Sequence, residues 1–295
     1  MAEPLDCAVV GGGPGGLTAA IYLARFRRSA VLFDAGGSRA RWIPESHNCP
    51  GFPSGVSGHD YLARLTVQAR SCHARIESTE VVSIRREGDL FVLGGPEETV
   101  ARKVILATGC EDVMPPLDGL EDAVACGAVR LCPICDGYEA IDRDIAVHGP
   151  LAETVDHAVF IRTFSRRVVV VPTDDSDDAD ARTRLRDAGV SVTAIGRELS
   201  FDGERCSFLL DGQRRAFEIV YPMLGARQNS NLAKALGAST DDDGALRVDH
   251  DQMTSVPGLY AIGDVVSALN QIAVATGHAA VAATHVHNAL PANLA

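Results

Sequence analysis

The chain has 295 residues, which is enough to bury a substantial core and more than one typical domain requires. Its net charge is −12, with acidic runs at 174–180 and 241–243, which argues against a nucleic-acid partner because phosphates need a basic face. No apolar run reaches the roughly 20 residues of a membrane span, and the N-terminus lacks a secretory pattern, so we expect a cytoplasmic protein without a membrane partner.

The first predicted element is a nucleotide-binding turn near the N-terminus. An apolar strand runs into a glycine-rich segment, a helical pattern follows, and a second apolar strand ends in Asp34. Gly11 would let the chain turn tightly, Gly13 would let a pyrophosphate approach the backbone, and Gly16 would let helix and strand pack closely. The phosphates would face the free N–H groups of the helix, and Asp34 would accept hydrogen bonds from a ribose. A glycine-rich turn without a ligand is the alternative.

The chain has eight cysteines, and two of them form a Cys-x-x-Cys pair in the segment LCPICDGYE. This spacing is typical of metal sites and disulfides. A pair such as Cys132 and Cys135 is half of a zinc site, a structural disulfide or a redox-active dithiol. Zinc would need a second such pair or two suitably spaced histidines, and those at 285 and 287 are too close together, so we expect no metal site. Cys110 follows an apolar run and is expected to be a buried small hydrophobic residue.

Two further apolar strands end in small-residue turns, in the segments KVILATG and LYAIGDVV. Together with the glycine-rich turn and the Cys-x-x-Cys-Asp motif, they resemble the low-molecular-weight thioredoxin reductases over nearly the whole chain. Residues 47–58 resemble the flavin-contacting loop of that family. Residues 223–237 resemble the strand and loop that lead back to its FAD domain, and 270–280 resemble the helix start that faces its flavin.

The resemblance implies that the first nucleotide-binding turn holds FAD. Asp264 would bind the ribityl or phosphate region, while Asn48, Thr108 and Gln271 would line the cofactor. The last helix would begin near the flavin C2 carbonyl, where its dipole stabilises the reduced ring. The residues expected to contact FAD are Gly11, Gly13, Pro14, Gly15, Gly16, Asp34, Asn48, Ala107, Thr108, Gly109, Gly263, Asp264, Gln271 and Ile272.

The resemblance also favours the redox-active dithiol over a structural or inert cysteine pair. It implies that Cys135 lies nearest the flavin, that Cys132 exchanges with the substrate sulfur, and that Asp136 manages protons. A Cys-x-x-Cys pair closes a short disulfide, and one sulfur stabilises the thiolate of the other, which is consistent with these roles.

A second nucleotide-binding outline, over 144–175, follows the dithiol, but its turn reads GPLAET. Pro150 and Leu151 stand where the family has glycines, and we expect the Leu151 side chain to enter the space a pyrophosphate needs. Asp174 and Asp175 replace the basic pair that grips a 2′-phosphate, and they would repel it. We therefore expect the protein to work without NADPH, and NADH is opposed less because its ribose carries no phosphate.

The alternation of strands and helices predicts an α/β protein with two Rossmann-like units and mainly parallel sheets, the second unit inserted in the first. We expect residues 1–115 and 249–295 to form the FAD-binding unit. Residues 116–248 would form the NAD(P)-binding-like unit that carries the Cys-x-x-Cys motif. Family members are usually homodimers, so the resemblance implies one here.

Four functional hypotheses follow. The first is a flavin-dependent thiol–disulfide oxidoreductase that serves a thioredoxin-like protein or a small-molecule dithiol or disulfide through an electron partner other than NADPH. The second is a small-molecule dithiol oxidase that uses O2, because CPICDGYE resembles the motif of the gliotoxin and holomycin dithiol oxidases, although Asp136 stands where those have His. An ordinary NADPH-dependent thioredoxin reductase and a non-enzymatic redox-sensing flavoprotein are the other two.

Overall fold

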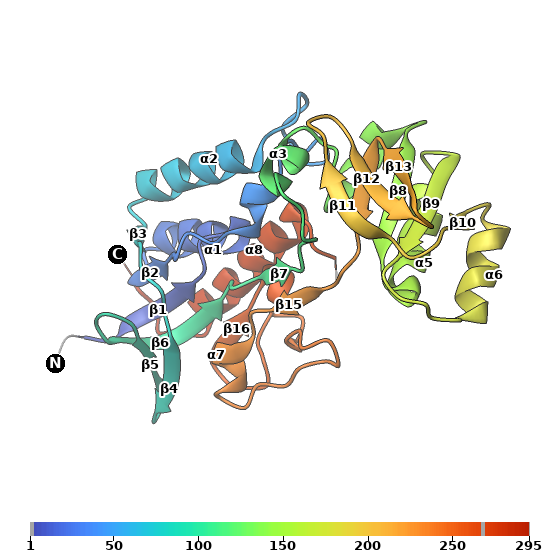
Figure 1. Ribbon diagram of the computed structural model, residues 1–295. Coiled ribbons are helices and arrows are strands. Elements are labelled where there is room, and N and C mark those ends of the chain that lie inside the picture. The colour runs from blue at the N-terminus through green and yellow to red at the C-terminus, as the bar shows by residue number, and fades with distance from the viewer. Residues whose placement is uncertain (1–2, 267–268, 295) are drawn as a thin grey trace.

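The structure is a computed structural model that describes residues 3–266 and 269–294. The chain folds into two α/β units that lie side by side, as Figure 1 shows. The first unit contains both ends of the chain, in blue and red, and the second contains its middle part. The α/β fold with mainly parallel sheets, expected from the sequence, is confirmed. Within the described residues, no helix combines the length and the apolarity needed to cross a membrane.

The first unit is built on a seven-stranded sheet of order β3-β2-β1-β6-β5-β4, in which β16 also pairs with β6. β1, β2, β3, β6 and β16 pair in parallel, whereas β4, β5 and β6 form an antiparallel meander. The strands are β1 (Leu5–Val10), β2 (Ala30–Phe33), β3 (Arg75–Glu77), β4 (Ser83–Glu87), β5 (Leu90–Gly94), β6 (Thr99–Leu106) and β16 (Leu259–Ala261). The helices are α1 (Pro14–Arg25), η1 (Arg39–Trp42), α2 (Gly58–Ser71), α7 (Asn231–Lys234), η3 (Gly263–Val265) and α8 (Ile272–Asn288).

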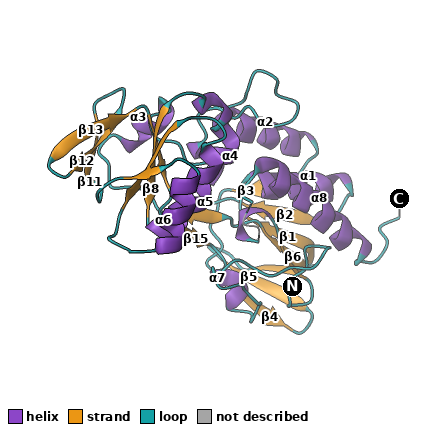
Figure 2. Ribbon diagram, turned by 90° about the vertical axis from the view of Figure 1, so that its right-hand side faces the viewer, coloured by secondary structure: helices purple, strands orange, loops and turns teal. Residues whose placement is uncertain are grey.

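Both faces of this sheet are buried, which explains why its central strands are almost wholly apolar. Along β1, Cys7 and Val9 enter the core beneath α1 and α8, whereas Ala8 and Val10 enter the core on the opposite face. Helices α1 and α8 lie next to each other over the first of these faces (Figure 2). The small residues of α8, such as Ala279, Ala282 and Ala283, are fully buried there and allow the two helices to approach closely. The packing fixes where the two helices begin, and both begin at the site described below.

The second unit has a four-stranded parallel sheet of order β10-β9-β8-β14. Helices α5 and α6 cover one face, and an antiparallel sheet of β11, β12 and β13 covers the other together with α3 (Figure 1). The strands are β8 (Asp144–Gly149), β9 (Arg167–Pro172), β10 (Ser191–Val192), β11 (Arg197–Phe201), β12 (Cys206–Leu210), β13 (Gln213–Phe217) and β14 (Ile219–Pro222). The helices are α3 (Leu120–Ala125), α4 (Pro133–Asp136), η2 (Tyr138–Ala140), α5 (Leu151–Ile161) and α6 (Ala179–Asp187).

The chain passes between the two units in two neighbouring segments. Strand β7 (Cys110–Asp112) leads out of the first unit and pairs antiparallel with β15 (Ala226–Gln228), which leads back. After β15 the chain packs into the core of the first unit through Ala233, Ala238 and Leu246. The unit boundaries stay a proposal, and this packing favours a return at β15 rather than at residue 248.

Candidate active site

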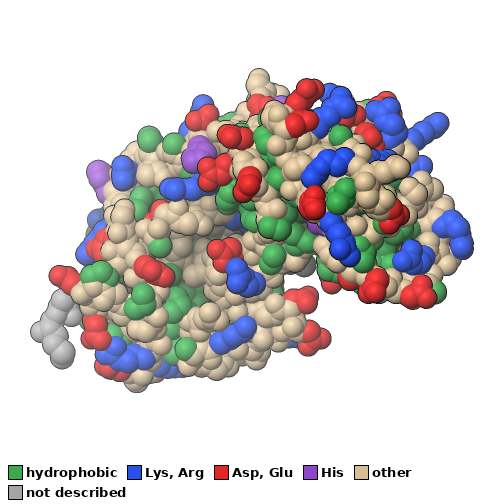
Figure 3. Space-filling view, in the orientation of Figure 1, with side chains coloured by type: hydrophobic (Ala, Val, Ile, Leu, Met, Phe, Trp, Pro, Cys, Tyr) green, Lys and Arg blue, Asp and Glu red, His purple; other side chains and the backbone are tan. Residues whose placement is uncertain are grey.

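The candidate active site is a cavity of about 570 Å³ that lies where the two units meet. The residues that follow β1, β2, β6 and β16 meet there, so the cavity lies at the carboxyl ends of parallel strands, where α/β sheets bind ligands. Leu131, Cys132 and Cys135 of the second unit contribute to its wall. The space-filling view shows a notch in the surface between the two units (Figure 3).

Most of the residues predicted from the sequence meet at this cavity. Two of them, Gly16 and Asp136, do not line it. Those that do are Gly11, Gly13, Pro14, Gly15, Asp34, Asn48, Ala107, Thr108, Gly109, Gly263, Asp264, Gln271, Ile272, Cys132 and Cys135.

The glycine-rich turn has the geometry that its sequence implies. Gly11 has a φ of +110°, and a Cβ on it would lie 2.2 Å from the carbonyl oxygen of Ala107. A Cβ on Gly16 would lie 1.8 Å from the carbonyl oxygen of Gly11, so helix α1 approaches the strand closely. A Cβ on Gly13 would meet only the hydroxyl of Ser38, at 3.4 Å, and therefore faces open space. The first turn of α1 has no side-chain cap, which leaves its N–H groups free for an anion.

Asp34 lies directly against the glycine-rich turn. A Cβ on Gly12 would come within 2.0 Å of the carboxyl carbon of Asp34, so a side chain at position 12 would displace this carboxylate. The Oδ1 atom of Asp34 accepts a hydrogen bond of 2.8 Å from the N–H of Gly36, which fixes the carboxylate at the cavity wall. Sequence reasoning did not single out Gly12, although it stands within the run Gly-Gly-Gly.

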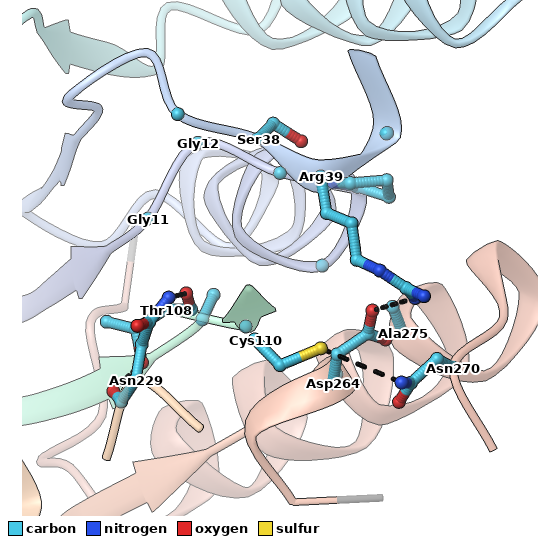
Figure 4. A pocket seen from close by; sticks show the side chains of 18 of the residues that line it. Gly11, Gly12, Ser38, Arg39, Thr108, Cys110, Asn229, Asp264, Asn270 and Ala275 are labelled. Carbon is cyan, nitrogen blue, oxygen red and sulfur yellow. Dashed lines mark hydrogen bonds and ion pairs between the residues drawn. The ribbon is translucent and has the colours of Figure 1, made fainter. Parts of the chain in front are cut away.

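A half-buried ion cluster closes another side of the cavity. The Arg39 guanidinium donates to both carboxylate oxygens of Asp112, at 2.6 and 2.9 Å, and to Oδ2 of Asp264 at 3.2 Å. Figure 4 shows Arg39 reaching toward Asp264. Burial raises the pKa of the Asp264 carboxyl, and Arg39 opposes that rise. The sequence identified Asp264 but missed Arg39 and Asp112, because nothing in a single sequence pairs residues so far apart.

Thr108 and Asn229 bind one another across the cavity edge. The Thr108 hydroxyl donates to the carbonyl oxygen of Asn229 at 2.7 Å, and the Asn229 amide donates to the carbonyl oxygen of Thr108 at 3.0 Å (Figure 4). The hydroxyl hydrogen of Thr108, which lines the cavity, is therefore already used in this bond. Asn229 is a lining residue that the sequence did not single out.

Cys110 and Asn270 form a polar corner of the same cavity. The Asn270 amide donates to Sγ of Cys110 at 3.6 Å, as Figure 4 shows, and burial raises the pKa of the Cys110 thiol to about 11. The amide oxygen of Asn270 is buried and has no hydrogen-bond partner within the described residues. A buried acceptor without a partner at a cavity wall is the position where a ligand donor would bind.

Cys132 and Cys135 are joined in a disulfide at the start of α4, as expected from their spacing. The N–H of Cys135 donates to Sγ of Cys132 at 3.2 Å. The side-chain amide of Gln271 donates to Sγ of Cys132 at 3.4 Å and to Sγ of Cys135 at 3.3 Å. Gln271 in turn accepts a hydrogen bond of 2.9 Å from Asn48. Residues of the first unit therefore hold the disulfide of the second unit at the cavity.

Asp136 lies outside the cavity wall, on the last position of α4. Its Oδ1 atom accepts a hydrogen bond of 2.7 Å from the hydroxyl of Tyr221 on β14. Arg130 donates to the Asp136 carbonyl oxygen at 2.8 Å. Burial raises the pKa of the Asp136 carboxyl to about 6, against the opposing effects of Tyr221 and Arg130. A carboxyl group with such a pKa accepts and donates protons near neutral pH.

The second nucleotide-binding turn corrects one expectation. The side chain of Leu151 is 1% exposed and packs into the core beneath α5, so it does not enter the space in front of the helix. As the first residue of α5, it follows the helical geometry that directs its side chain against the sheet.

Other features of this turn oppose a pyrophosphate. Pro150 is the N-cap of α5 and has no N–H to offer, and Glu153 places a negative charge in the first helical turn. Asp174 and Asp175 follow the end of β9, as expected.

Comparison with known proteins identifies relatives that span most of this chain. A model of the pyridine nucleotide-disulphide oxidoreductase family matches residues 5–279. The chain is 29% identical to a thioredoxin reductase of Mycolicibacterium smegmatis over 276 residues, covering 88% of each chain. It is 30% identical to a thioredoxin reductase of Streptomyces clavuligerus, covering 90% of this chain and 87% of the relative.

Solved structures show the same similarity. The crystal structure of HlmI matches with a TM-score of 0.88 and 28% identity, covering 97% of this chain and 92% of HlmI. Thioredoxin reductase from Streptococcus pyogenes matches with a TM-score of 0.88 and 26% identity, covering 96% of this chain and 97% of that structure.

Proposed function

The chain belongs to the pyridine nucleotide-disulphide oxidoreductase family and is a flavin-dependent disulfide oxidoreductase, and from this premise we propose that its dithiol serves a substrate without drawing on NADPH. Cys132 and Cys135 would pass electrons between FAD and the disulfide or dithiol of a thioredoxin-like protein or a small molecule. The observation that carries the proposal is that the Cys132–Cys135 disulfide lines the same cavity as the glycine-rich turn.

FAD fits the residues that surround this cavity. The open space before Gly13 and the uncapped N–H groups of α1 suit a pyrophosphate, and the carboxylate of Asp34 suits a ribose. The Asn270 amide oxygen, which has no partner among the described residues, offers an acceptor to the polar edge of a flavin. The start of α8, at Ile272, would bring the positive end of a helix dipole to the ring. Bound FAD would supply the two-electron chemistry that connects the dithiol to an electron donor or acceptor.

The two cysteines would act in sequence in the reduced protein. The Cys132 thiolate attacks one sulfur of a substrate disulfide, which forms a mixed disulfide and releases the other substrate sulfur as a thiolate. The Cys135 thiolate then attacks Sγ of Cys132, restores the Cys132–Cys135 disulfide and releases the second substrate sulfur. Two electrons pass from the dithiol to the substrate, and each released thiolate takes up one proton. The N–H of Cys135, 3.2 Å from Sγ of Cys132, favours Cys132 as the attacking thiolate.

Asp136 would supply one of these protons. Its pKa of about 6 lets it be protonated in part of the molecules at neutral pH and regain its proton from water between turnovers. In the opposite direction the ionised carboxylate would accept a proton from a substrate thiol. The same residues therefore serve disulfide reduction and dithiol oxidation.

Charges and a missing hydrogen-bond donor at the second nucleotide-binding turn would disfavour NADPH. Pro150 lacks an N–H, Glu153 opposes an anion at the start of α5, and Asp174 and Asp175 oppose a 2′-phosphate. An enzyme of this kind needs another electron partner. A low-potential protein donor would drive disulfide reduction, and O2 as acceptor would drive dithiol oxidation, which is the second candidate.

Anaerobic stopped-flow absorbance at the flavin band tests the proposal. The FAD-loaded protein is mixed with NADPH, with NADH and with dithionite, and then, when oxidised, with dithiothreitol. We expect bleaching by dithionite and by the dithiol, and little or none by NADPH. Rapid bleaching by micromolar NADPH would overturn the proposal. Oxygen consumption with excess dithiol then separates dithiol oxidation, in which O2 is consumed at the rate of turnover, from disulfide reduction.

A further inference from the structure

Tyr221 makes a hydrogen bond that the proposed chemistry has not used. It lies on β14, the edge strand that pairs with β8, and its side chain is 0% exposed. Its hydroxyl donates to Oδ1 of Asp136 at 2.7 Å across 85 positions of sequence. A phenol in so apolar a strand needs a polar partner, since an unpaired buried hydroxyl is unfavourable. Asp136 is that partner.

We propose that Tyr221 is the positioning residue of Asp136, holding the carboxyl by Oδ1 and thereby reserving Oδ2 for the proton that is exchanged with the dithiol. The proposal rests on the proposed acid–base role of Asp136. A protonated carboxyl carries its hydrogen on one oxygen only, and Oδ1 is already an acceptor from Tyr221. Because β14 pairs in register with β8 and Tyr221 is fully buried, the hydroxyl is held in place and in turn holds the carboxyl.

Among the residues that the structure describes, the other charged groups that act on the Asp136 carboxyl are Arg130 and Glu139. Arg130, before α4, donates to the Asp136 carbonyl oxygen and favours the carboxylate. Glu139, on η2, disfavours the carboxylate, and one of its own carboxyl oxygens is buried without a partner within the described residues. Within the described part of the chain, Tyr221 is the side chain that donates a hydrogen bond to the Asp136 carboxyl. Removing its hydroxyl changes the carboxyl and leaves both charges in place.

The sign of the effect follows from the hydrogen bond. A hydroxyl that donates to a carboxylate stabilises the ionised form more than the protonated form, so it lowers the pKa of Asp136 against the larger effect of burial. Tyr221→Phe should raise that pKa. A more acidic phenol at the same position, 3-fluorotyrosine, donates more strongly and should lower it. The pH at which turnover depends on Asp136 should move with the pKa, in either direction of electron flow.

The experiment has two readouts on the same proteins. Infrared difference spectra of the oxidised protein follow the carbonyl stretch of the protonated carboxyl against pH, and the band is assigned to Asp136 by its loss in Asp136→Asn. The pH–rate profile of dithiol turnover is measured in parallel. We expect the midpoint of both to move up by roughly one pH unit in Tyr221→Phe, and down with 3-fluorotyrosine. Thermal melts establish that the variants are folded.

Tyr260→Phe is the matched control. Tyr260 is 1% exposed, and its hydroxyl meets Nδ1 of His285 at 3.1 Å, away from the dithiol. This variant should leave the Asp136 midpoint where it is. An infrared midpoint that is the same in wild type, Tyr221→Phe and the fluorinated protein would overturn the proposal. If the infrared midpoints move but Asp136→Asn leaves the turnover rate unchanged, the positioning contact is supported. The acid–base role of Asp136 is then overturned instead.

Discussion

Gln271 and Cys135 are 136 positions apart in the sequence, yet the side-chain amide of Gln271 donates to Sγ of Cys135 at 3.3 Å. The same nitrogen reaches Sγ of Cys132 at 3.4 Å, and Asn48 holds the oxygen of the amide at 2.9 Å. A polar contact from the start of α8 therefore ties the dithiol of one unit to the cavity of the other. The contact is specific to a side chain that has both a donor and an acceptor.

Gln271→Leu should free the disulfide from this contact. The variant keeps a similar volume but removes the donors, so an external thiol should reduce the Cys132–Cys135 disulfide about fivefold faster, as expected for the loss of one modest hydrogen bond. Reduction of the FAD-free protein by dithiothreitol, followed by alkylation and mass spectrometry, measures the rate. Gln68→Leu, at an exposed position of α2, is the control. Equal rates in the three proteins would show that the contact does not protect the disulfide.

Gly13→Val should abolish FAD binding while the protein stays folded. A Cβ at this position meets only Ser38 at 3.4 Å, so the branched side chain would fit the protein and occupy the space before the helix. Flavin absorbance after gel filtration, together with a thermal melt, measures both properties. Gly277→Val is the control, because a Cβ at this exposed position of α8 meets nothing within 4 Å. A Gly13→Val protein with a full complement of FAD would mean that the nucleotide binds elsewhere.

The two cysteines should give different spectra when each is replaced. In Cys132→Ser the remaining thiolate of Cys135 should lie beside the flavin and produce a long-wavelength charge-transfer band, whereas Cys135→Ser should leave the flavin bound but uncoupled from dithiol substrates. Absorbance between pH 5 and 9 measures the band. Cys126→Ser, which changes an exposed free cysteine of the same unit, should behave as wild type. A band in Cys135→Ser instead would exchange the two roles.

Asp136→Asn should slow dithiol turnover by about 10²-fold, the usual effect of removing one acid–base group.

The same substitution should also change how the free energy of unfolding depends on pH. Burial raises the pKa of Asp136 from 3.8 to about 6, so the stability that protonation provides is present below the unfolded value and is lost as the pH rises through 6. Between pH 4 and 7 the wild type should lose at most about 3 kcal/mol relative to the variant. Chemical denaturation at the two pH values measures the difference, and parallel curves would contradict it.

The second nucleotide-binding turn should resist simple repair. Pro150→Gly with Glu153→Gln restores an N–H and removes one charge, but Asp174 and Asp175 still oppose the 2′-phosphate, so NADPH should not bleach the flavin. Adding Asp174→Arg and Asp175→Arg should allow weak NADPH binding, measured by quenching of its fluorescence. NADH serves as the matched ligand, because it lacks the phosphate that the arginines would bind. Equal gains for NADH and NADPH would show that the acidic pair is not the barrier.

The parts of the site that follow local rules were predictable from the sequence. The glycine-rich turn, its strand and helix, and the Cys-x-x-Cys pair each depend on residues close together in the chain, and the structure brings them to one cavity. The prediction for Leu151 was wrong because the sequence places the residue in the turn but does not show which way its side chain points. That direction depends on where α5 begins and on the sheet beneath it.

Contacts between distant segments were beyond sequence reasoning for a physical reason. Arg39 reaches Asp264 across 225 positions, and Tyr221 reaches Asp136 across 85. Tyr221 in particular lies in an apolar strand, where the sequence pattern predicts only a large buried core residue. The fold brings β14 next to α4, and only there does the Tyr221 hydroxyl meet the Asp136 carboxyl.

The pairing of β7 with β15 has a consequence for protein engineering. The N–H of Val113 donates to the carbonyl oxygen of Gly225 at 2.9 Å, so the two ends of the intervening segment are almost in contact. Because the ends of the segment adjoin, we expect that it can be exchanged for the corresponding segment of a relative with little change to the flanking chain. A chimera that carries a relative's segment with a glycine-rich pyridine nucleotide turn should therefore accept electrons from a pyridine nucleotide.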